Sequence, residues 1–453
     1  MRYAIVTFGC RVNQADSLRI EEDLRRRGGA DAPVREADLV VVNTCSVTAT
    51  ADQGARQTIR RIARDNPSAR IVVTGCYATR EPATVTALPN VVRVVPNGLK
   101  ERLVGDLSGA DLQTELTTAE RFGSGDGACG EPMSPGVAGR TAFTLRVQTG
   151  CEEQCAYCII PSTRGPGRSV PVAQVLKEIR RVSEAGFKEV ALTGVHLGSY
   201  GRDLSPSSSL LSLLDAIDAS HLDVVIRISS LEPMDCSPAI VALVAASGGR
   251  FAPHFHLPLQ HGSDRTLRRM RRPYSLADYR RVIDDIVTRM PHASIGSDMI
   301  VGFPGETVTD FAASVEYLAS SPLSHLHVFP YSERPGTEAA GMTARVQAPV
   351  IRDRGTRLRE IGSELARRFR QSQVGTVRPG LTLEDGTLVV TDNYLKVRIP
   401  PGERRNSRVQ VRIEDGDGVI RGVVVRSPIP GLSDRRPSAS RASGRAPSPE
   451  TTR

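Results

Sequence analysis

The sequence predicts an α/β protein made of three folded parts. Apolar strands alternate with helical stretches over residues 1–103, and six more strand-then-helix units cover residues 138–330. Five short strands, separated by Gly, Asp and Asn turns, follow over residues 372–426. Regular alternation is typical of parallel sheets, whereas closely spaced short strands favour a small barrel. A length of 453 residues also fits about three domains.

The expected domain boundaries follow changes in composition. We expect an N-terminal parallel-sheet domain, a linker low in apolar residues, a central partial barrel, a small C-terminal β-barrel and a disordered tail rich in Ser, Pro, Arg and Gly. These parts cover residues 1–103, 104–137, 138–370, 371–427 and 428–453, respectively.

The N-terminal domain repeats one pattern, in which an apolar strand is followed by a cysteine. Strands are predicted at residues 3–7, 39–42 and 71–74, and helices at 16–27 and 49–66. The carboxyl ends of parallel strands lie at one edge of a sheet, where ligands gather, so the cysteines are expected to meet there. A lone cysteine is more often a small buried residue. Three at equivalent positions favour a metal site formed by Cys10, Cys45 and Cys76.

A second cysteine triplet follows the first strand of the central part. Cys151, Cys155 and Cys158 share one loop at C-x3-C-x2-C spacing. The six strands are predicted at residues 143–147, 190–192, 224–228, 255–257, 297–301 and 326–329. They form a partial (β/α)6 barrel, and the loop opens at the face where such barrels hold their chemistry. Three thiolates so close together favour a soft metal centre.

The missing fourth ligand indicates the type of centre. A structural zinc site is closed by four protein ligands, but no Cys or His follows Cys158 within a short loop; the next histidine is His196. This favours an iron–sulfur cluster with one open iron over structural zinc or a cluster of buried cysteines. Cys129 and Cys236 have no partner at ligand spacing and are expected to be incidental thiols.

The net charge of +9 is concentrated near the C-terminus. Residues 351–453 carry 21 Lys and Arg against 12 Asp and Glu, and the rest of the chain is neutral. A basic end favours a polyanion such as nucleic acid, although a solvated charged surface is the plainer alternative. The basic block 265–272 is open to the same two interpretations. No apolar run could span a membrane and no signal peptide precedes the first strand, so we expect a cytoplasmic protein whose cysteines are reduced thiols or metal ligands rather than disulfides.

The motifs resemble those of the radical S-adenosylmethionine (SAM) methylthiotransferases over roughly residues 1–426. The resemblance rests on both cysteine triplets in their order, within Phe8-Gly9-Cys10-Arg11-Val12-Asn13-Gln14, Asn43-Thr44-Cys45, Thr74-Gly75-Cys76 and the loop 151–158. Residues 192–201, 227–233 and 328–332 look like the tRNA threonylcarbamoyladenosine branch of that family. One departure is His261, where family members often have Ser.

The resemblance implies a radical SAM barrel, a C-terminal TRAM RNA-binding domain and two 4Fe–4S clusters. Cys151, Cys155 and Cys158 would hold the cluster that binds SAM, and Cys10, Cys45 and Cys76 would hold the one that carries the transferred sulfur. SAM contacts would come from Tyr157, Thr193, Gly194, Ser229, Glu232 and Gly302, and RNA contacts from Arg268, Arg269, Arg271 and Arg272.

The implied reaction adds a methylthio group to C2 of N6-threonylcarbamoyladenosine beside the tRNA anticodon. It would need a low-potential electron donor and a sulfur source, neither of which the sequence identifies. Two alternatives stay open within the family, namely isopentenyladenosine in tRNA and an aspartate of a ribosomal protein. A more distant alternative is a non-catalytic RNA-binding protein stabilised by metal.

Overall fold

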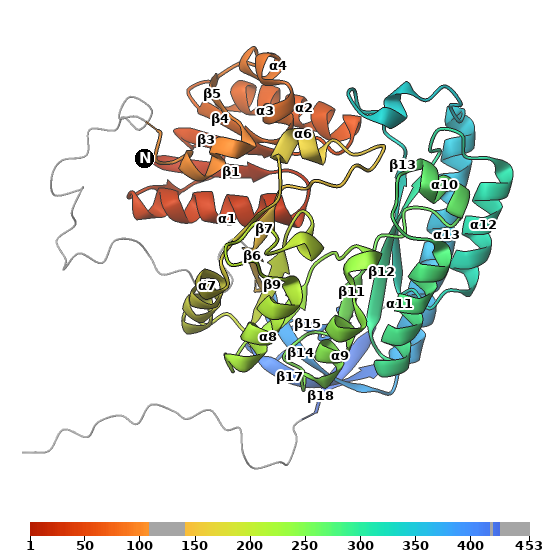
Figure 1. The fold of residues 1–453 in the computed structure, drawn as a ribbon. Coiled ribbons are helices and arrows are strands. Elements are labelled where there is room, and N and C mark those ends of the chain that lie inside the picture. The colour runs from red at the N-terminus through yellow and green to blue at the C-terminus, as the bar shows by residue number, and fades with distance from the viewer. Residues whose placement is uncertain (108–140, 417–419, 426–453) are drawn as a thin grey trace, which may run out of the picture.

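A computed structural model describes residues 1–107, 141–416 and 420–425. The predicted tail, nearly all of the predicted linker, and Cys129 within that linker lie outside these residues. Within the described part, no helix is both long enough and apolar enough to cross a bilayer. Figure 1 shows the N-terminal part in red and orange, set against the green strands of the central part.

The N-terminal domain is a five-stranded parallel sheet of order β2-β1-β3-β4-β5. Its strands are β1 (Arg2–Thr7), β2 (Ala30–Asp31), β3 (Leu39–Thr44), β4 (Arg70–Gly75) and β5 (Val91–Val95). Its helices are α1 (Arg11–Arg26), α2 (Ala49–Asp65), α3 (Cys76–Arg80), α4 (Pro82–Thr86) and the 3-10 turn η1 (Asn97–Arg102). Side chains of the central strands alternate between two separate apolar cores, one on each face of the sheet. The three strands predicted before a cysteine are confirmed, but α1 begins directly after Cys10 rather than at Asp16.

The central part contains the six predicted strands, and all run parallel to their neighbours. They are β6 (Phe143–Arg146), β9 (Glu189–Thr193), β10 (Val225–Ile228), β11 (His254–His256), β12 (Ser294–Val301) and β13 (His325–Pro330). They pair as two three-stranded sheets, β10-β9-β6 and β11-β12-β13, linked by one isolated bridge between Ile226 and Phe251. The strands therefore follow one another in chain order, as expected for a series of βα units.

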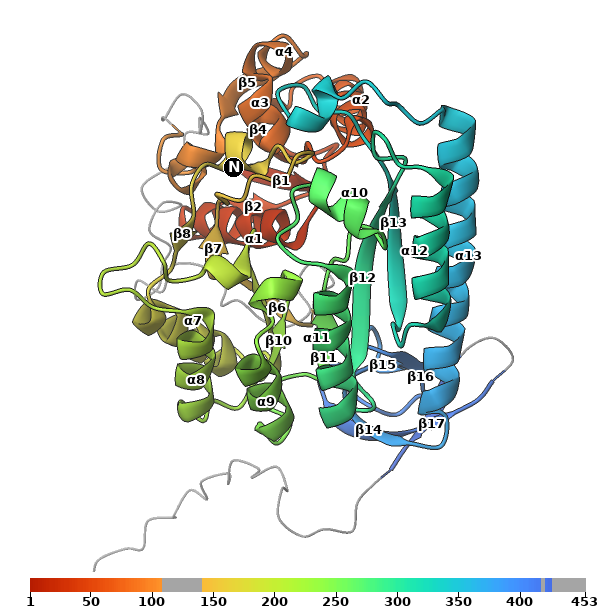
Figure 2. The same ribbon diagram turned by 45° about the vertical axis from the view of Figure 1, so that its right-hand side comes forward.

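Helices cover the outer side of these strands. They are α7 (Val172–Glu184), α8 (Leu210–Ala219), α9 (Pro238–Ala246), α10 (Asp264–Arg269), α11 (Leu276–Arg289), α12 (Val308–Ser320) and α13 (Ala348–Gln373). The short helix α6 (Ile160–Arg164) instead lies against α3 and η1 of the N-terminal domain. Two short strands, β7 (Gln148–Thr149) and β8 (Arg168–Ser169), flank the cysteine loop. Figure 2 shows α13 running beside α12 along β13.

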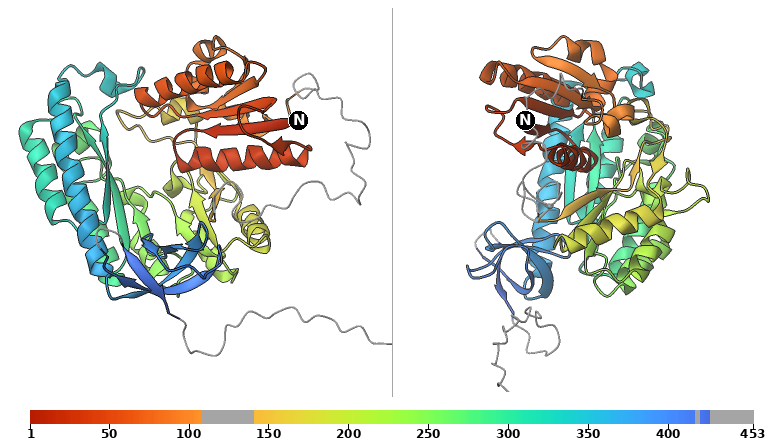
Figure 3. Two further views of the ribbon diagram at one scale, coloured as in Figure 1. Left: turned by 180° about the vertical axis from the view of Figure 1, so that it is seen from behind. Right: turned by 90° about the vertical axis from the view of Figure 1, so that its left-hand side faces the viewer.

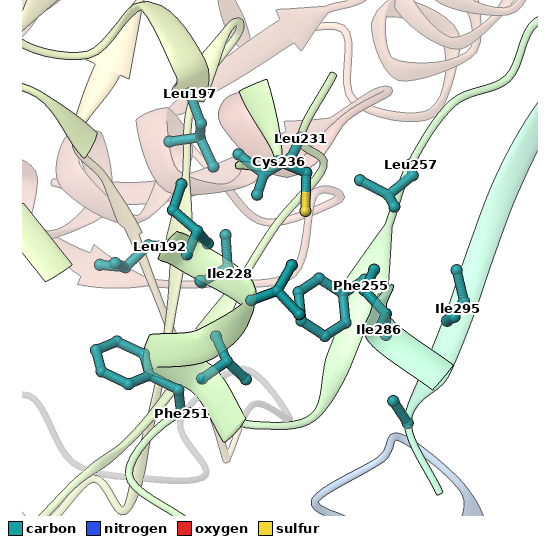
Figure 4. Close-up of a cluster of buried hydrophobic side chains, with 14 of the residues drawn as sticks. Leu192, Leu197, Ile228, Leu231, Cys236, Phe251, Phe255, Leu257, Ile286 and Ile295 are labelled. Carbon is teal, nitrogen blue, oxygen red and sulfur yellow. The ribbon is translucent and has the colours of Figure 1, made fainter. Parts of the chain in front are cut away.

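One large apolar core joins the strands to their helices. Figure 4 shows Leu192 of β9 and Ile228 of β10 near Phe255 of β11, with Ile286 of α11 and Ile295 of β12 on the other side. Cys236 lies in this core, 2% exposed, and burial raises the pKa of its thiol to about 12. It behaves as a small apolar residue, which agrees with its prediction as an incidental thiol.

The C-terminal strands close into a small barrel, as predicted. They are β14 (Val377–Leu383), β15 (Leu388–Thr391), β16 (Lys396–Arg398), β17 (Arg408–Glu414) and β18 (Arg421–Val424), in the order β14-β15-β16-β18-β17. Buried and exposed residues alternate strictly along β17, so every second side chain fills the interior. Figure 3 shows this barrel in blue beside the C-terminal end of α13.

The small barrel is fixed to the central part by polar contacts. Arg227 of β10 donates to the carbonyl of Asp392 at 2.8 Å and stacks on the Tyr394 ring, 4.9 Å from its centroid. Asn393 donates to the carbonyl of His292 at 2.8 Å. The loop between β15 and β16 is therefore held against the strands that build the central part.

Candidate functional site

The structure brings Cys10, Cys45 and Cys76 together at one edge of the N-terminal sheet. They follow β1, β3 and β4, whose carboxyl ends lie side by side. Cys10 is exposed, whereas Cys45 and Cys76 are buried. Burial raises the pKa of the Cys45 thiol to about 11, and the nearby Cys10 and Cys76 add to the shift. The prediction that these distant cysteines would meet in space is confirmed.

A glycine makes the close approach of two of these cysteines possible. Gly9 has a φ of +86°, and a Cβ atom built on it would lie 2.6 Å from both Cβ and Sγ of Cys45. No side chain fits in that space, because real contacts are never so short. The residue before Cys10 must therefore be glycine for the Cys45 thiol to sit where it does.

Buried asparagines hold the loops that carry these cysteines. The Asn13 side chain donates to the carbonyls of Phe8 at 2.8 Å and Thr44 at 2.9 Å, which fixes the backbone before Cys10 and before Cys45. Arg164, from the central part, donates to the Asn13 side-chain oxygen at 2.5 Å. Asn97 lies 3.5 Å from the Cys76 sulfur. The sequence analysis did not assign a role to Asn13, Asn97 or Arg164.

The second triplet occupies the loop between β7 and α6, and its thiols are half-buried. Burial raises the pKa of Cys158 to about 12; a hydrogen bond from the backbone N–H of Ile160 opposes the rise, and the two neighbouring thiols of the triplet add to it. Arg272 donates to the Cys155 sulfur at 3.0 Å and also pairs with Glu232. A positive group thus lies against one of the three thiols, and the neighbouring carboxylate holds it there.

Gln148 connects this loop to the next βα loop. Its side-chain oxygen accepts the backbone N–H groups of Val195 and His196, each at 2.9 Å. Its side-chain nitrogen donates to the carbonyls of Thr149 at 3.0 Å and Gly150 at 2.8 Å. One buried amide therefore fixes the loop that begins at Cys151 relative to the loop after β9, a role that the sequence analysis missed.

His196 lies at the inner edge of the cysteine loop. Its Nε2 is 2.7 Å from Asp235 Oδ2, and its Nδ1 is 3.9 Å from the Cys151 sulfur. Burial lowers the pKa of His196, but the bond to Asp235 outweighs it, and the net value is about 10. His196 therefore forms a hydrogen-bonded pair with Asp235, and its other ring nitrogen faces the cysteine loop.

The two triplets fit iron–sulfur clusters better than single metal ions. Among the described residues, one set of three side chains brings its ligand atoms within 4.8 Å of one another, and that set is His256, Asp298 and His327. Neither cysteine triplet is so compact. Thiolates that each bind a different iron of a cluster need wider spacing than thiolates that share one ion. A bound cation would also relieve the unfavourable ionisation of buried thiols such as Cys45 and Cys158.

A cavity of about 880 Å³ opens between the N-terminal domain, the central strands and the small barrel. Cys10 and Cys45 line it from one side, and Thr193, Gly194 and Ser229 line it from the ends of β9 and β10. Its size is that of a small-molecule site. Of the residues predicted to contact SAM, these last three therefore lie on a cavity that reaches one of the cysteine triplets.

The other predicted SAM residues lie elsewhere. Tyr157 packs edge-on against Phe303, with ring centroids 6.4 Å apart, in a small apolar cluster. Glu232 is engaged with Arg272. A Cβ atom on Gly302 would lie 2.4 Å from the Ile351 side chain, so the glycine there makes room for α13 to pack.

The basic block divides into exposed and buried arginines. Arg268 and Arg271 are exposed. Arg269 donates to the carbonyl of Pro304 at 3.1 Å. Arg272 is 7% exposed and donates to the Cys155 sulfur, so its side chain is engaged at the cysteine loop; its contact with RNA stays a prediction.

Two protein-family models match the chain, one in the N-terminal domain and one in the central part. Residues 2–96 fit the family model described as uncharacterized protein family UPF0004, and residues 145–318 fit the radical SAM superfamily model. The threonylcarbamoyladenosine tRNA methylthiotransferase MtaB of Bacillus subtilis is 35% identical over 404 residues, which are 87% of this chain and 89% of that protein. The protein of the same name from Aquifex aeolicus is 34% identical, covering 88% and 96%.

Relatives with two other names are nearly as similar. A tRNA-2-methylthio-N(6)-dimethylallyladenosine synthase of Sorangium cellulosum is 34% identical, covering 83% of this chain and 80% of that protein. A ribosomal protein uS12 methylthiotransferase of Saccharopolyspora erythraea is 33% identical and covers 83% of each chain.

The fold also matches a solved structure. The radical SAM methyltransferase TsrM from Kitasatospora setae, whose structure contains cobalamin and a 4Fe–4S cluster, superimposes with a TM-score of 0.53 over 75% of this chain and 76% of that one. The two sequences are only 14% identical, so this likeness concerns the fold.

Proposed function

The chain belongs to the radical SAM methylthiotransferase family, and from this we propose that it adds a methylthio group to C2 of N6-threonylcarbamoyladenosine next to the tRNA anticodon. Family membership makes the chain a transferase that uses SAM and 4Fe–4S clusters. The two relatives described above that are named for threonylcarbamoyladenosine cover 87% and 88% of this chain, against 83% for the two described with other names.

One observation carries the proposal most directly. The cavity lined by Cys10 and Cys45 also reaches Thr193, Gly194 and Ser229, at the face where the 151–158 loop follows the first strand of the central part. Two three-thiol sites near one cavity suit a reaction in which one centre activates a carbon atom and the other delivers sulfur to it. When bound, the clusters and SAM would supply the radical that removes hydrogen from C2 and the sulfur that replaces it.

We assign the ligands as the two cysteine triplets, with the remaining residues in supporting roles. Cys151, Cys155 and Cys158 hold the cluster that binds SAM, and Arg272 donates to the sulfur of Cys155. Cys10, Cys45 and Cys76 hold the second cluster. Gln148 and Asn13 keep the loops of these two sites in place through bonds to backbone groups. Hydrogen bonds of this kind orient ligands and adjust the potential of a cluster.

The basic helix α13 supplies positive surface for tRNA, and the small barrel supplies a fold suited to it. Residues 348–373 carry seven Arg against three Asp and Glu, whereas residues 374–425 are nearly neutral, with eight Lys and Arg against seven Asp and Glu. The barrel has the closed five-stranded form of oligonucleotide-binding folds. The edges of an adenine in a single-stranded loop are accessible to protein, whereas those in an A-form helix are hidden. A tRNA substrate also places the reaction in the cytoplasm.

The test is nucleoside mass analysis of tRNA from a strain that lacks the gene. Loss of the 2-methylthio form of N6-threonylcarbamoyladenosine, with its unmethylthiolated precursor accumulating, is the expected result. Loss of only the isopentenyl product, or of the methylthio group on a ribosomal protein, would instead favour one of the two sister activities.

A second experiment separates the enzyme from a metal-stabilised RNA-binding protein. Anaerobic reconstitution should give about eight irons per chain, as two 4Fe–4S clusters require. Reduction should then cleave SAM. One equivalent of zinc, with SAM left intact, would contradict the enzymatic proposal.

A further inference from the structure

The cavity contains an arginine without an acidic partner. Arg11 is the first residue of α1, next to Cys10, and is half-buried. Its Nη1 lies 3.4 Å from Ser229 Oγ, and its Nη2 lies 3.4 Å from the Tyr394 hydroxyl. The guanidinium also stands over the Tyr394 ring, 5.7 Å from its centroid. No carboxylate in the described ranges forms an ion pair with Arg11.

These contacts leave most of the binding capacity of Arg11 unused. A guanidinium has five N–H donors in a planar fork, and the two contacts here are long and go to neutral hydroxyls. The side chain is nevertheless held in one place, because Ser229 comes from the central strands and Tyr394 from the small barrel. It is thus a positioned cation that faces a cavity.

The rest of the cavity does not cancel this charge. Asp298 is the one acidic side chain among the described residues that line it, and Arg370 adds a second guanidinium at its edge. His256 and His327 each lie 3.1 Å from Asp298 Oδ1. Burial by itself would raise the pKa of Asp298, but the bonds to these histidines outweigh it and lower the value to about 2. This carboxylate is already engaged by its own neighbours.

The lowered pKa of the buried His254 also indicates positive charge around the cavity. Burial first, and then the charges of Arg227 and Arg11, hold the pKa of His254 well below its usual range. His254 also lines the cavity, and its ring lies 4.8 Å from that of Tyr394. An anion that enters the cavity would therefore meet positive charge that no protein carboxylate offsets.

We infer that Arg11 binds the carboxylate of the threonylcarbamoyl group on the substrate adenosine, an inference that rests on the function proposed above. The threonine part of this group carries a free carboxylate, which a guanidinium binds through two parallel hydrogen bonds. An isopentenyl group carries no charge and would leave Arg11 unpaired. Because Arg11 follows Cys10 directly, the bound nucleoside would lie beside the second cysteine triplet.

The test compares two anticodon stem-loop RNAs with the reconstituted holoenzyme. One carries N6-threonylcarbamoyladenosine, and the other carries the same nucleoside with its carboxylate converted to a neutral primary amide. For the wild-type enzyme, kcat/KM should be about 10- to 100-fold higher with the acid, the usual value of a hydrogen bond between charged groups. In Arg11→Gln this ratio should fall to near one, and in Arg11→Lys it should be intermediate.

Arg19→Gln is the matched control. It removes a charge from an exposed position of the same helix, where Arg19 pairs with Glu101 at 3.3 Å, and it should keep the wild-type ratio. Arg370→Gln removes the second guanidinium that lines the cavity and should lower the ratio less than Arg11→Gln does. Dissociation constants for both RNAs are measured in parallel. Their ratio gives the preference for the acid even in a variant whose turnover is too slow to measure.

Three results would overturn the inference. The wild-type enzyme could have the same kcat/KM for the acid and the amide RNA, or Arg11→Gln could keep the wild-type ratio of the two values. The third is a ratio that falls to near one in Arg370→Gln but not in Arg11→Gln. An equal loss on both RNAs in Arg11→Gln would mean that Arg11 contacts phosphate or SAM. Failure of the proposed function looks different, because the wild-type enzyme would then leave the acid RNA unmodified and act on isopentenyl RNA or on a ribosomal protein.

Discussion

Asp16 and Arg146 meet across the boundary between the N-terminal domain and the central part, with Oδ1 of the carboxylate 2.6 Å from Nη1 of the guanidinium. The other oxygen of Asp16 lies 3.0 Å from Lys100 Nζ and 3.5 Å from Arg164 Nη2. Burial would raise the pKa of Asp16, but these three cations outweigh it and lower the value to about 2. One buried carboxylate therefore joins the two parts beneath the edge that carries Cys10, Cys45 and Cys76.

Replacing this carboxylate should destabilise the protein strongly. Asp16→Asn would leave Lys100 and Arg164, both buried, without their counter-charge, which typically costs about 3–5 kcal/mol. The measurement is urea denaturation of the anaerobic holoprotein. Asp38→Asn is the control, because Asp38 pairs with Arg2 at the surface and should lose less than about 1 kcal/mol. Equal stability of the two variants would contradict a structural role for Asp16.

The two cysteine triplets should separate by function. Cys155→Ala should leave about four irons per chain and abolish SAM cleavage. Cys45→Ala should also leave about four irons, but it should keep some SAM cleavage while no sulfur is inserted. Cys236→Ala, in the apolar core, should keep the full iron content. Iron analysis and product mass spectrometry check all three, and methylthiolation by Cys45→Ala would show that the second site is misassigned.

Gly9 should be needed for the second cluster. In Gly9→Ala the new methyl group would overlap the Cys45 side chain, so iron bound at the second triplet should fall while SAM cleavage at the first persists. Gly28→Ala is the matched control, because Gly28 has a similar φ of +78° with nothing within 4 Å of a built Cβ. It should show only the modest cost of backbone strain, about 1 kcal/mol. Equal iron loss in both variants would mean that strain, rather than the contact with Cys45, is responsible.

Arg272 should set the reduction potential of the first cluster. Its guanidinium donates to the Cys155 sulfur at 3.0 Å, and a positive donor at a cluster sulfur stabilises the reduced state. Arg272→Gln should therefore lower the potential and make the cluster harder to reduce, as measured by a redox titration followed by electron paramagnetic resonance. Arg268→Gln changes an exposed arginine of α10 and should leave the potential unchanged. A potential unaffected by Arg272→Gln would contradict this role.

The sequence predicts the strands and both cysteine triplets well, because hydrophobic periodicity and the spacing of cysteines are local signals. It misplaces the start of α1, since the buried polar residue Asn13 interrupts the apolar pattern in the first turn of the helix. Gln148 was missed, and Arg272 was assigned to RNA rather than to the cysteine loop, for a different reason. Each looks like an ordinary polar surface residue, and its role depends on backbone groups or a thiol that only the folded chain brings near.

The attachment of the small barrel bears on protein engineering. Tyr394 and Leu395 form part of the wall of the cavity, and the neighbouring Asp392 and Asn393 anchor their loop to the central strands. A chain cut after α13 would thus lose part of the wall of this cavity, together with the small barrel that we propose binds tRNA. If the small barrel is exchanged between sister enzymes, substrate preference should change only when the 392–395 loop is exchanged together with the residues of the central part that bind it.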